Sequence, residues 1–311
     1  MQIYLPIAEL SLNLFFLIGI GGAVGFLSGL FGVGGGFLLT PLLIFAGIPP
    51  SVAVASVTGQ VVAASTSGVL SYWRRGAIDL KLATFLAAAG VIGAFIGVLT
   101  FSALRSAGQL DLAISLGYLF FLGLIGALML SESVRSIARR RQAGGNLREK
   151  LPGQHNWVHG LPLRVRFHRS RLYISILPVI GIGLAIGFLG AVLGIGGGFI
   201  LVPALIYILR VPGSVVIGTS LLQVLAIMAA STVLHAVDSQ SVDFILAISL
   251  MAGGVAGAQF GVSASQYLRG DQLRGLLALI ILGVAIRFAL SLLLTPADPY
   301  SMAVIGPGGA L

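Results

Sequence analysis

Long apolar runs recur along the whole of this chain, and they limit its fold more than any other feature. Several exceed about 18 residues, the length that an α-helix needs to cross a bilayer. Hydrophobic residues make up 57% of the chain and charged residues only 9%, whereas soluble domains carry roughly a quarter charged residues. Outer-membrane barrels would show short alternating segments instead. The sequence therefore predicts an all-α, polytopic helical membrane protein.

The runs fall into two halves with the same order of elements. Each half starts with one apolar element that glycines interrupt, and three full-length helices follow. The expected segments of the first half are Leu12–Leu30, Gly36–Ile48, Val52–Tyr72, Leu80–Phe101 and Leu110–Leu130. Those of the second half are Leu172–Leu193, Gly198–Leu209, Val215–His235, Val242–Ala264 and Leu273–Leu294.

These segments divide the chain into four parts. Residues 1–130 form a first transmembrane repeat, residues 131–172 a basic cytoplasmic linker and residues 173–294 a second repeat. The remaining residues 295–311 are rich in glycine and proline, so we expect a C-terminal tail of loose coil.

One glycine-rich stretch occurs once in each half. Gly25 to Pro41 reads GFLSGLFGVGGGFLLTP, and Gly187 to Pro203 reads GFLGAVLGIGGGFILVP. Glycine permits unusual backbone angles, and proline removes a helical hydrogen-bond donor. Matching interruptions in two halves of a membrane protein are the best sequence indication of a transporter binding site.

The halves also align beyond the glycines, which indicates an internal duplication. Gln60 matches Gln223, and Pro50 matches Pro212. A pattern of small residues at every third or fourth position, typical of closely packed helices, recurs in both halves: Gly90, Gly93 and Gly97 match Gly254, Gly257 and Gly261. We assign this pattern to packing.

Basic residues concentrate in the linker. Between Ser131 and Leu172 the chain has ten Lys or Arg and two Glu, so this segment holds +8 of the net charge of +9. The positive-inside rule places such a loop in the cytoplasm, next to anionic lipid headgroups. Nucleic acid is not an expected partner, because no recognition motif accompanies the charge.

The path of the chain at Gly196–Gly198 determines how the two halves are related. If the chain turns back there as a hairpin, Arg210, Arg269 and Arg274 lie in the cytoplasm; if it passes straight through, they lie outside, against the rule. The second arm of each interrupted element is also too short for a comfortable crossing at about 1.5 Å per residue. We favour re-entrant hairpins and inverted-topology repeats, with plain membrane spans as the alternative.

Two such hairpins would bring their glycine turns together near the middle of the bilayer. A helix that begins there directs backbone N–H groups and the positive end of its dipole at the centre, which suits an anion. We therefore predict substrate binding at two sets of glycines: Gly34, Gly35 and Gly36, and Gly196, Gly197 and Gly198. Close helix packing, which also needs glycine, is the alternative.

The helix after each hairpin contributes polar side chains to the prediction. Ser56 and Gln60 share one helix face, as do Thr219 and Gln223 in the other half. Hydroxyl and carboxamide groups can hydrogen-bond the oxygens of an oxyanion without a permanent charge. Hydrogen bonds between helices are the alternative, at under about 1 kcal/mol each.

Four ionisable residues remain candidates for anion attraction or coupling. Arg287 lies well inside an expected helix, where it either attracts an anion or extends to the interface. Asp79 and Asp243 stand at helix starts, where a carboxylate serves as an N-cap or carries protons. His235 lies near a helix end. It either caps that end or gains and loses a proton near neutral pH.

The sequence gives little support to an enzymatic function. Ser28 and His235 could form an intramembrane serine hydrolase, but nothing in their spacing brings them together, and Gly190 replaces Ser28 in the repeat. The glycine runs are neither P-loops nor dinucleotide fingerprints, so we expect no cofactor. The chain has no cysteine, which excludes disulfides and thiolate metal sites. No signal peptide is evident.

The doubled Gly-x-Gly-Gly-Gly-Phe…Pro element, on either side of a basic central loop, resembles the TauE/SafE family, also called the 4-toluene sulfonate uptake permease or sulfite exporter family. The family pattern falls on Gly32, Gly34–Gly36, Pro41 and Gln60, and on Gly194, Gly196–Gly198, Pro203 and Gln223. The central loop is longer than in a compact member.

The resemblance implies a secondary carrier, without ATP use, for sulfite, sulfoacetate or aromatic sulfonates in a bacterial inner membrane. The expected partners are a small anionic substrate and membrane lipids. A homodimer is one assembly that such a fold allows. An anion channel of the same architecture and, further off, a membrane enzyme are the alternatives.

Overall fold

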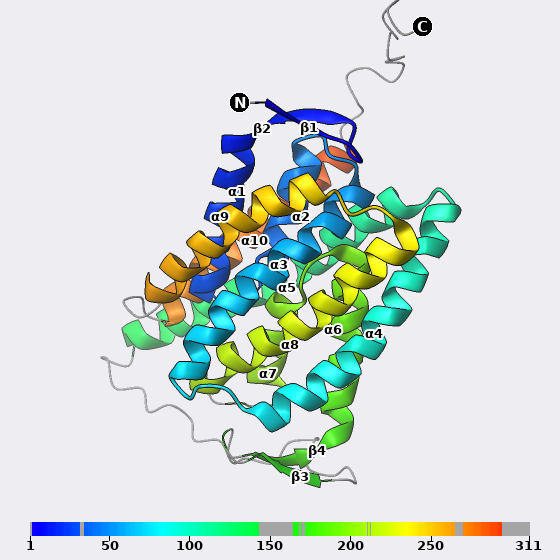
Figure 1. Ribbon diagram of the computed structural model, residues 1–311. Helices are drawn as coiled ribbons and strands as arrows, with labels where there is room; N and C mark the ends of the chain where they lie inside the picture. The colour runs from blue at the N-terminus through cyan, green and yellow to red at the C-terminus, as the bar shows by residue number, and fades with distance from the viewer. Residues whose placement is uncertain are drawn as a thin grey trace, which may run out of the picture.

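The computed structural model describes residues 2–31, 34–142, 164–167, 169, 172–209, 211, 213–264 and 270–293. Within these ranges, seven helices are long and apolar enough to cross a membrane. The helices form one bundle (Figure 1), and large apolar side chains remain exposed on its outer surface: Phe95, Ile96, Leu99, Phe120 and Leu124. The prediction of an all-α polytopic membrane protein is confirmed.

Ten α-helices in the described part of the chain follow the predicted order. The first five are α1 (Leu14–Phe31), α2 (Gly36–Phe45), α3 (Pro50–Arg74), α4 (Leu80–Ser106) and α5 (Leu110–Gln142). The second five are α6 (Ile176–Leu193), α7 (Gly198–Tyr207), α8 (Gly213–Leu234), α9 (Phe244–Ala264) and α10 (Gly270–Leu293), and a one-turn π-helix, η2 (His235–Ser239), continues α8.

Two strand pairs were not predicted. Strand β1 (Gln2–Leu5) pairs antiparallel with β2 (Leu10–Asn13), and β3 (Arg164–Phe167) pairs antiparallel with β4 (Leu172–Ser175). The helix expected from Leu172 therefore begins only at Ile176, after Ser175 accepts a hydrogen bond from the N–H of Leu177 as its N-cap. Four-residue strands are too short to show a clear alternation.

The fifth helix is longer than predicted. Helix α5 continues to Gln142, well beyond the predicted end at Leu130, so a helix occupies the first part of segment 131–172. The predicted tail, residues 295–311, lies outside the described part of the chain.

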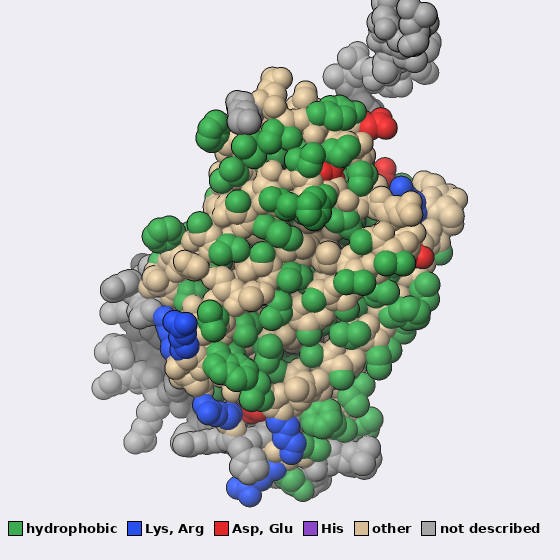
Figure 2. Space-filling model, in the orientation of Figure 1, with side chains coloured by type: hydrophobic (Ala, Val, Ile, Leu, Met, Phe, Trp, Pro, Cys, Tyr) green, Lys and Arg blue, Asp and Glu red, His purple; other side chains and the backbone are tan. Residues whose placement is uncertain are grey.

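The two interrupted elements are hairpins that start from opposite ends of the bundle (Figure 1). Helix α1 begins beside β1 and β2, and α2 leads back toward that end. Helix α6 begins beside β3 and β4, and α7 leads back toward the other end. Helices α3 and α8 lie between the hairpins, and most Lys and Arg side chains visible in Figure 2 lie toward the end with β3 and β4.

Each hairpin packs against a helix of the other half through glycines. A methyl group on Gly257 in α9 would overlap the carbonyl oxygen of Gly22 in α1, and one on Gly93 in α4 would overlap that of Leu184 in α6. The predicted role of the repeated glycine pattern in close packing is thus confirmed. At these helix crossings, backbone atoms of the neighbouring helix fill the space that a side chain would need.

Alanine at these positions should destabilise the fold. Gly93→Ala and Gly257→Ala should each lower the free energy of unfolding by about 1–3 kcal/mol, the usual cost of overpacking, measured by thermal unfolding in detergent. Gly19→Ala in α1 and Gly181→Ala in α6 are matched controls, since an added methyl group has no neighbour within 4 Å at either position. Equal stability of all four variants would contradict the packing described here.

Candidate functional site

The two glycine turns meet in the interior of the bundle. A methyl group on Gly36 would overlap the carbonyl oxygen of Gly194, and one on Gly196 would lie 3.5 Å from the carbonyl oxygen of Gly34. The structure therefore brings the two predicted sets of glycines into contact, one from each hairpin. Gly32, which the family pattern includes, is outside the described residues.

Both turns need glycine for their backbone conformation. The φ angles of Gly34 and Gly35 are +88° and +68°, and those of Gly196 and Gly197 are +76° and +71°. L side chains rarely adopt this left-handed region. The N–H of Gly36 bonds the carbonyl of Gly34 at 2.8 Å, which closes the first turn tightly.

Two helix N-termini lie side by side at this point. Helices α2 and α7 start at Gly36 and Gly198, and neither has a side-chain cap. Backbone carbonyls of the turns accept part of their first N–H groups, as Gly34 does for Gly36 and Gly197 for Ile200. The helix dipole places a partial positive charge at each start. Phe37 and Phe199, the next residues, stack with ring centroids 5.5 Å apart.

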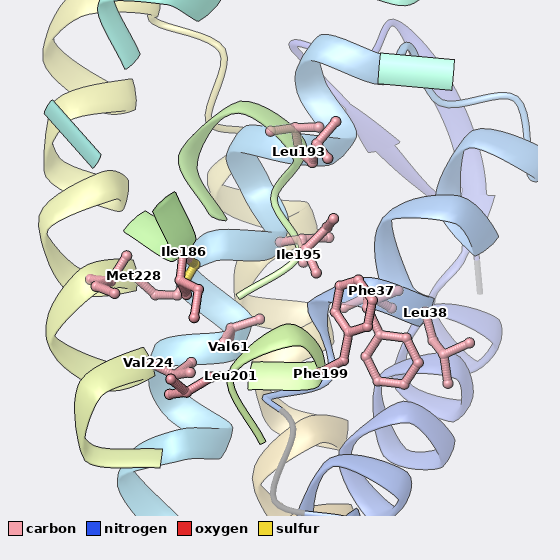
Figure 3. Close-up of a cluster of buried hydrophobic side chains, with 14 of the residues drawn as sticks. Phe37, Leu38, Val61, Ile186, Leu193, Ile195, Phe199, Leu201, Val224 and Met228 are labelled. Carbon is pink, nitrogen blue, oxygen red and sulfur yellow. The ribbon is translucent and has the colours of Figure 1, made fainter. Parts of the chain in front are cut away.

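Two valines from the central helices pack against the turns. A methyl group on Gly34 would lie 2.9 Å from Val224 in α8 and 3.5 Å from Val61 in α3. Figure 3 shows both valines among the apolar side chains that surround the site, with Ile195, Phe37 and Phe199 nearby. The middle parts of α3 and α8 thus line the turns.

Gln60 and Gln223 come directly before these valines. Both side chains are 0% exposed, and neither amide nitrogen nor amide oxygen has a hydrogen-bond partner among the described residues. A buried polar group without a partner costs roughly 1–3 kcal/mol. The amide of Gln60 packs against Gly254 in α9. Two such amides at matching positions of α3 and α8, each next in sequence to a valine that contacts the turns, indicate a place for a polar ligand or for water.

Ser56 and Thr219, also predicted to bind substrate, have other partners. The hydroxyl of Ser56 accepts a hydrogen bond from the N–H of Asp243 at 2.9 Å, and that of Thr219 accepts one from the N–H of Asp79 at 3.1 Å. Each hydroxyl thus holds the start of a helix from the other half. The structure therefore gives both residues a packing role.

Asp79 and Asp243 cap the helices that follow them. Asp79 accepts a hydrogen bond from the N–H of Leu82, and Asp243 accepts one from the N–H of Leu246, both at 3.1 Å. The second carboxylate oxygen of Asp243 accepts the N–H of Ile7 at 3.0 Å, which fixes the turn between β1 and β2. Of the two predicted roles, capping is the one that the structure displays.

Arg287 and His235 lie apart from the glutamines. The guanidinium of Arg287 is exposed and stands 5.4 Å from the ring centroid of Phe45, the last residue of α2, a helix length away from the glycines. His235 is buried, with Nε2 3.0 Å from the carbonyl oxygen of Ala191 and its ring packed edge-on to Phe101.

Three side chains hold the carbonyl groups at the end of α6. His235 contacts the carbonyl of Ala191, Tyr118 donates to that of Leu193 at 2.6 Å, and Thr40 donates to that of Gly194 at 3.5 Å. Sequence reasoning missed Tyr118 and Thr40. Their only signal was a hydroxyl within an apolar run.

Within the described ranges, no three or more His, Asp or Glu side chains gather where they could hold a metal ion. The amide groups of Gln60 and Gln223 can donate hydrogen bonds to the oxygens of an anion.

Comparisons with known proteins show which sequences this chain resembles. The family model described as sulfite exporter TauE/SafE matches residues 17–288. A probable membrane transporter protein of Xylella fastidiosa (strain 9a5c) is 32% identical over 284 residues, which cover 88% of this chain and 94% of that protein. The probable membrane transporter protein YjnA of Bacillus subtilis (strain 168) is 31% identical over 262 residues, covering 83% and 93%. No solved structure matches this chain.

The capping role of Asp79 can be separated from proton transfer. Asp79→Asn should keep the cap, because asparagine is an equally good N-cap, whereas Asp79→Ala should lower stability by about 1 kcal/mol. Transport driven by a proton gradient in proteoliposomes should then be retained in Asp79→Asn. Loss of gradient-driven transport in this variant, at normal thermal stability, would instead show that the carboxylate carries a proton.

Proposed function

Since this chain belongs to the TauE/SafE family of membrane transporters, we propose that it is a secondary transporter for a small sulfur-containing anion. The substrate is an organosulfonate or a sulfite-like ion, and it crosses the bacterial inner membrane by alternating access. The observation that carries the proposal is the meeting of two helix N-termini without side-chain caps at turns that contact Val61 and Val224. The residues before these valines, Gln60 and Gln223, have buried amides without partners among the described residues.

The charges at this site suit a monovalent oxyanion. Each helix N-terminus is equivalent to about half an elementary positive charge, so α2 and α7 together offset roughly one negative charge. The amide groups of Gln60 and Gln223 can donate to the oxygens of the ion. Because none of these groups carries a full charge, the anion is held without the strong attraction that would prevent its release.

Inverted repeats are part of the proposal. The two hairpins start from opposite ends of the bundle (Figure 1), and their packing is reciprocal, with α1 against α9 and α6 against α4. The bonds from Asp243 to Ser56 and from Asp79 to Thr219 are reciprocal as well. This arrangement supports a two-fold axis between α3 and α8, and movement of the two halves around it would expose the site to either face in turn.

The glutamines provide the direct test. Gln60→Ala and Gln223→Ala should each raise the KM for sulfur-labelled sulfite or sulfonate in proteoliposomes by roughly 10- to 100-fold, because a hydrogen bond to a charged group contributes about 1.5–3 kcal/mol. Gln259→Ala is the matched control, since this glutamine is exposed on α9. Wild-type kinetics in both site variants would remove the glutamines from the site.

Counterflow distinguishes a carrier from a channel. A carrier should show saturable exchange that unlabelled substrate on the opposite side accelerates. Flux that neither saturates nor responds to that substrate would contradict alternating access and indicate an anion channel of the same fold.

The inverted topology predicts which positions face each side. The chain has no native cysteine, so single substitutions can be labelled without background. Glu9→Cys and Ala107→Cys should react with an impermeant thiol reagent from outside, and Arg75→Cys and Arg166→Cys from the cytoplasm, because basic loops stay inside. All four are exposed. Labelling of Glu9→Cys and Arg75→Cys from the same side would overturn the topology.

A further inference from the structure

Four side chains hold every buried side-chain nitrogen or oxygen atom that lacks a hydrogen-bond partner in the described part of the chain. They are Gln60 and Ser65 in α3, and Gln223 and Ser231 in α8. All four residues are 0% exposed. Folded proteins contain few such atoms, and each asks for an explanation. The glutamines belong to the proposed site, but the serines do not.

The two serines differ from several other hydroxyl residues of the helices. A serine or threonine within a helix commonly donates its hydroxyl to the carbonyl three or four residues earlier. Thr66 donates in this way to Val62 at 2.7 Å, Ser71 to Ser67 at 3.2 Å, and Ser249 to Ile245 at 2.7 Å. Ser65 and Ser231 make no such bond, so each hydroxyl keeps a hydrogen to donate elsewhere.

Ser65 follows Val61 by one turn of α3, in the direction of β3 and β4, and lies on the same helix face. Val61, one turn earlier, contacts Gly34 and Gly196, and Gly68, one turn later, contacts Leu221 in α8. Residues spaced by three or four share a helix face, so Ser65 stands between these two contacts. It is roughly 7 Å along the helix axis from Gln60.

Ser231 lies on α8 beyond the glycine turns, in the direction of the opposite end of the bundle. Val224 contacts Gly34, Met228 contacts Gly190 in α6, and His235 contacts Ala191. Ser231 falls between Met228 and His235 on this face, roughly 12 Å along the axis from Gln223. Helix α8 runs toward the end of the bundle that carries β1 and β2 (Figure 1), so Ser65 and Ser231 lie on opposite sides of the glycine turns along the bundle.

We propose that Ser65 and Ser231 are access subsites for the transported anion, one on each side of the central site. The proposal rests on the transport function proposed above. Each hydroxyl donates one hydrogen bond to an oxygen of a sulfonate or sulfite-like ion on its way between the centre and one face. Ser65 serves the face with β3 and β4, and Ser231 serves the face with β1 and β2. A single uncharged donor holds the ion weakly enough to pass it on.

The test measures apparent affinity from each face separately. Right-side-out and inverted membrane vesicles that contain Ser65→Ala or Ser231→Ala are assayed for exchange of labelled sulfite and of a labelled sulfonate. Ser65→Ala should raise the KM on the order of tenfold at the face with β3 and β4, and leave the other face within about twofold of wild type. Ser231→Ala should give the reverse pattern.

Thermal unfolding separates this role from a structural one. Removing a buried hydroxyl that has no partner relieves its desolvation cost, so both variants should have a Tm equal to or above that of the wild type. Ser249→Ala is the matched control, because this serine is also buried but bonds its own helix. It should leave the KM at both faces unchanged.

The outcomes are distinct. If the wild type exchanges the labelled anion and both serine variants keep its KM at both faces, the access subsites are overturned while the transport function stands. An equal loss at both faces with a lowered Tm would also overturn them, since it indicates a structural role. If the wild type exchanges neither anion, the proposed function itself fails, and the subsites fail with it.

Discussion

A helix that ends inside a bilayer leaves backbone N–H and carbonyl groups without water to bind, and the rest of this structure follows from how those groups are satisfied. Lipid tolerates such backbone only where protein buries it or where it lines a polar cavity. The two hairpins solve the problem jointly, because each glycine turn covers the other. The carbonyl ends are bonded by protein side chains, as at α6. The N–H ends have no side-chain cap, and backbone carbonyls of the turns accept part of their N–H groups, as Gly34 does for Gly36 and Gly197 for Ile200.

The close packing around the turns serves the same requirement. Glycines let α1 lie against α9, and α6 against α4, with backbone in direct contact. Long side chains at these crossings would hold the hairpins apart, and the uncapped ends of α2 and α7 would separate. The helix starts at Asp79 and Asp243 are fixed by hydroxyl groups of the opposite half. Each half therefore positions elements of the other, and neither hairpin is placed by its own half alone.

Much of this arrangement was predictable from the sequence, for identifiable physical reasons. Apolar runs of bilayer length predicted the helices, and glycine triplets predicted their breaks. The strand pairs were missed because four residues give too little alternation. The polar side chains on one face of α3 were only partly informative. Ser56 and Gln60 share that face, yet the hydroxyl of Ser56 accepts a hydrogen bond from a backbone N–H, while the amide of Gln60 has no partner among the described residues. Spacing along one helix cannot show which donor lies opposite on another. Ser65 was overlooked for the same reason.

The three bonds to the end of α6 have a consequence for the duplication itself. Positions 40, 118 and 235 carry threonine, tyrosine and histidine, whereas valine and tyrosine occupy the positions that match Thr40 and His235 in the other half, at 202 and 72. In a dimer of identical half-length chains, each of these side chains would occur once in each half. A single chain that holds both copies is free of that restriction, and its two turns differ in their bonding. Side chains bond the carbonyl end of α6, whereas the residues that match Thr40 and His235 are Val202 and Tyr72. The two glycine turns are therefore similar in backbone but not equivalent in what holds them.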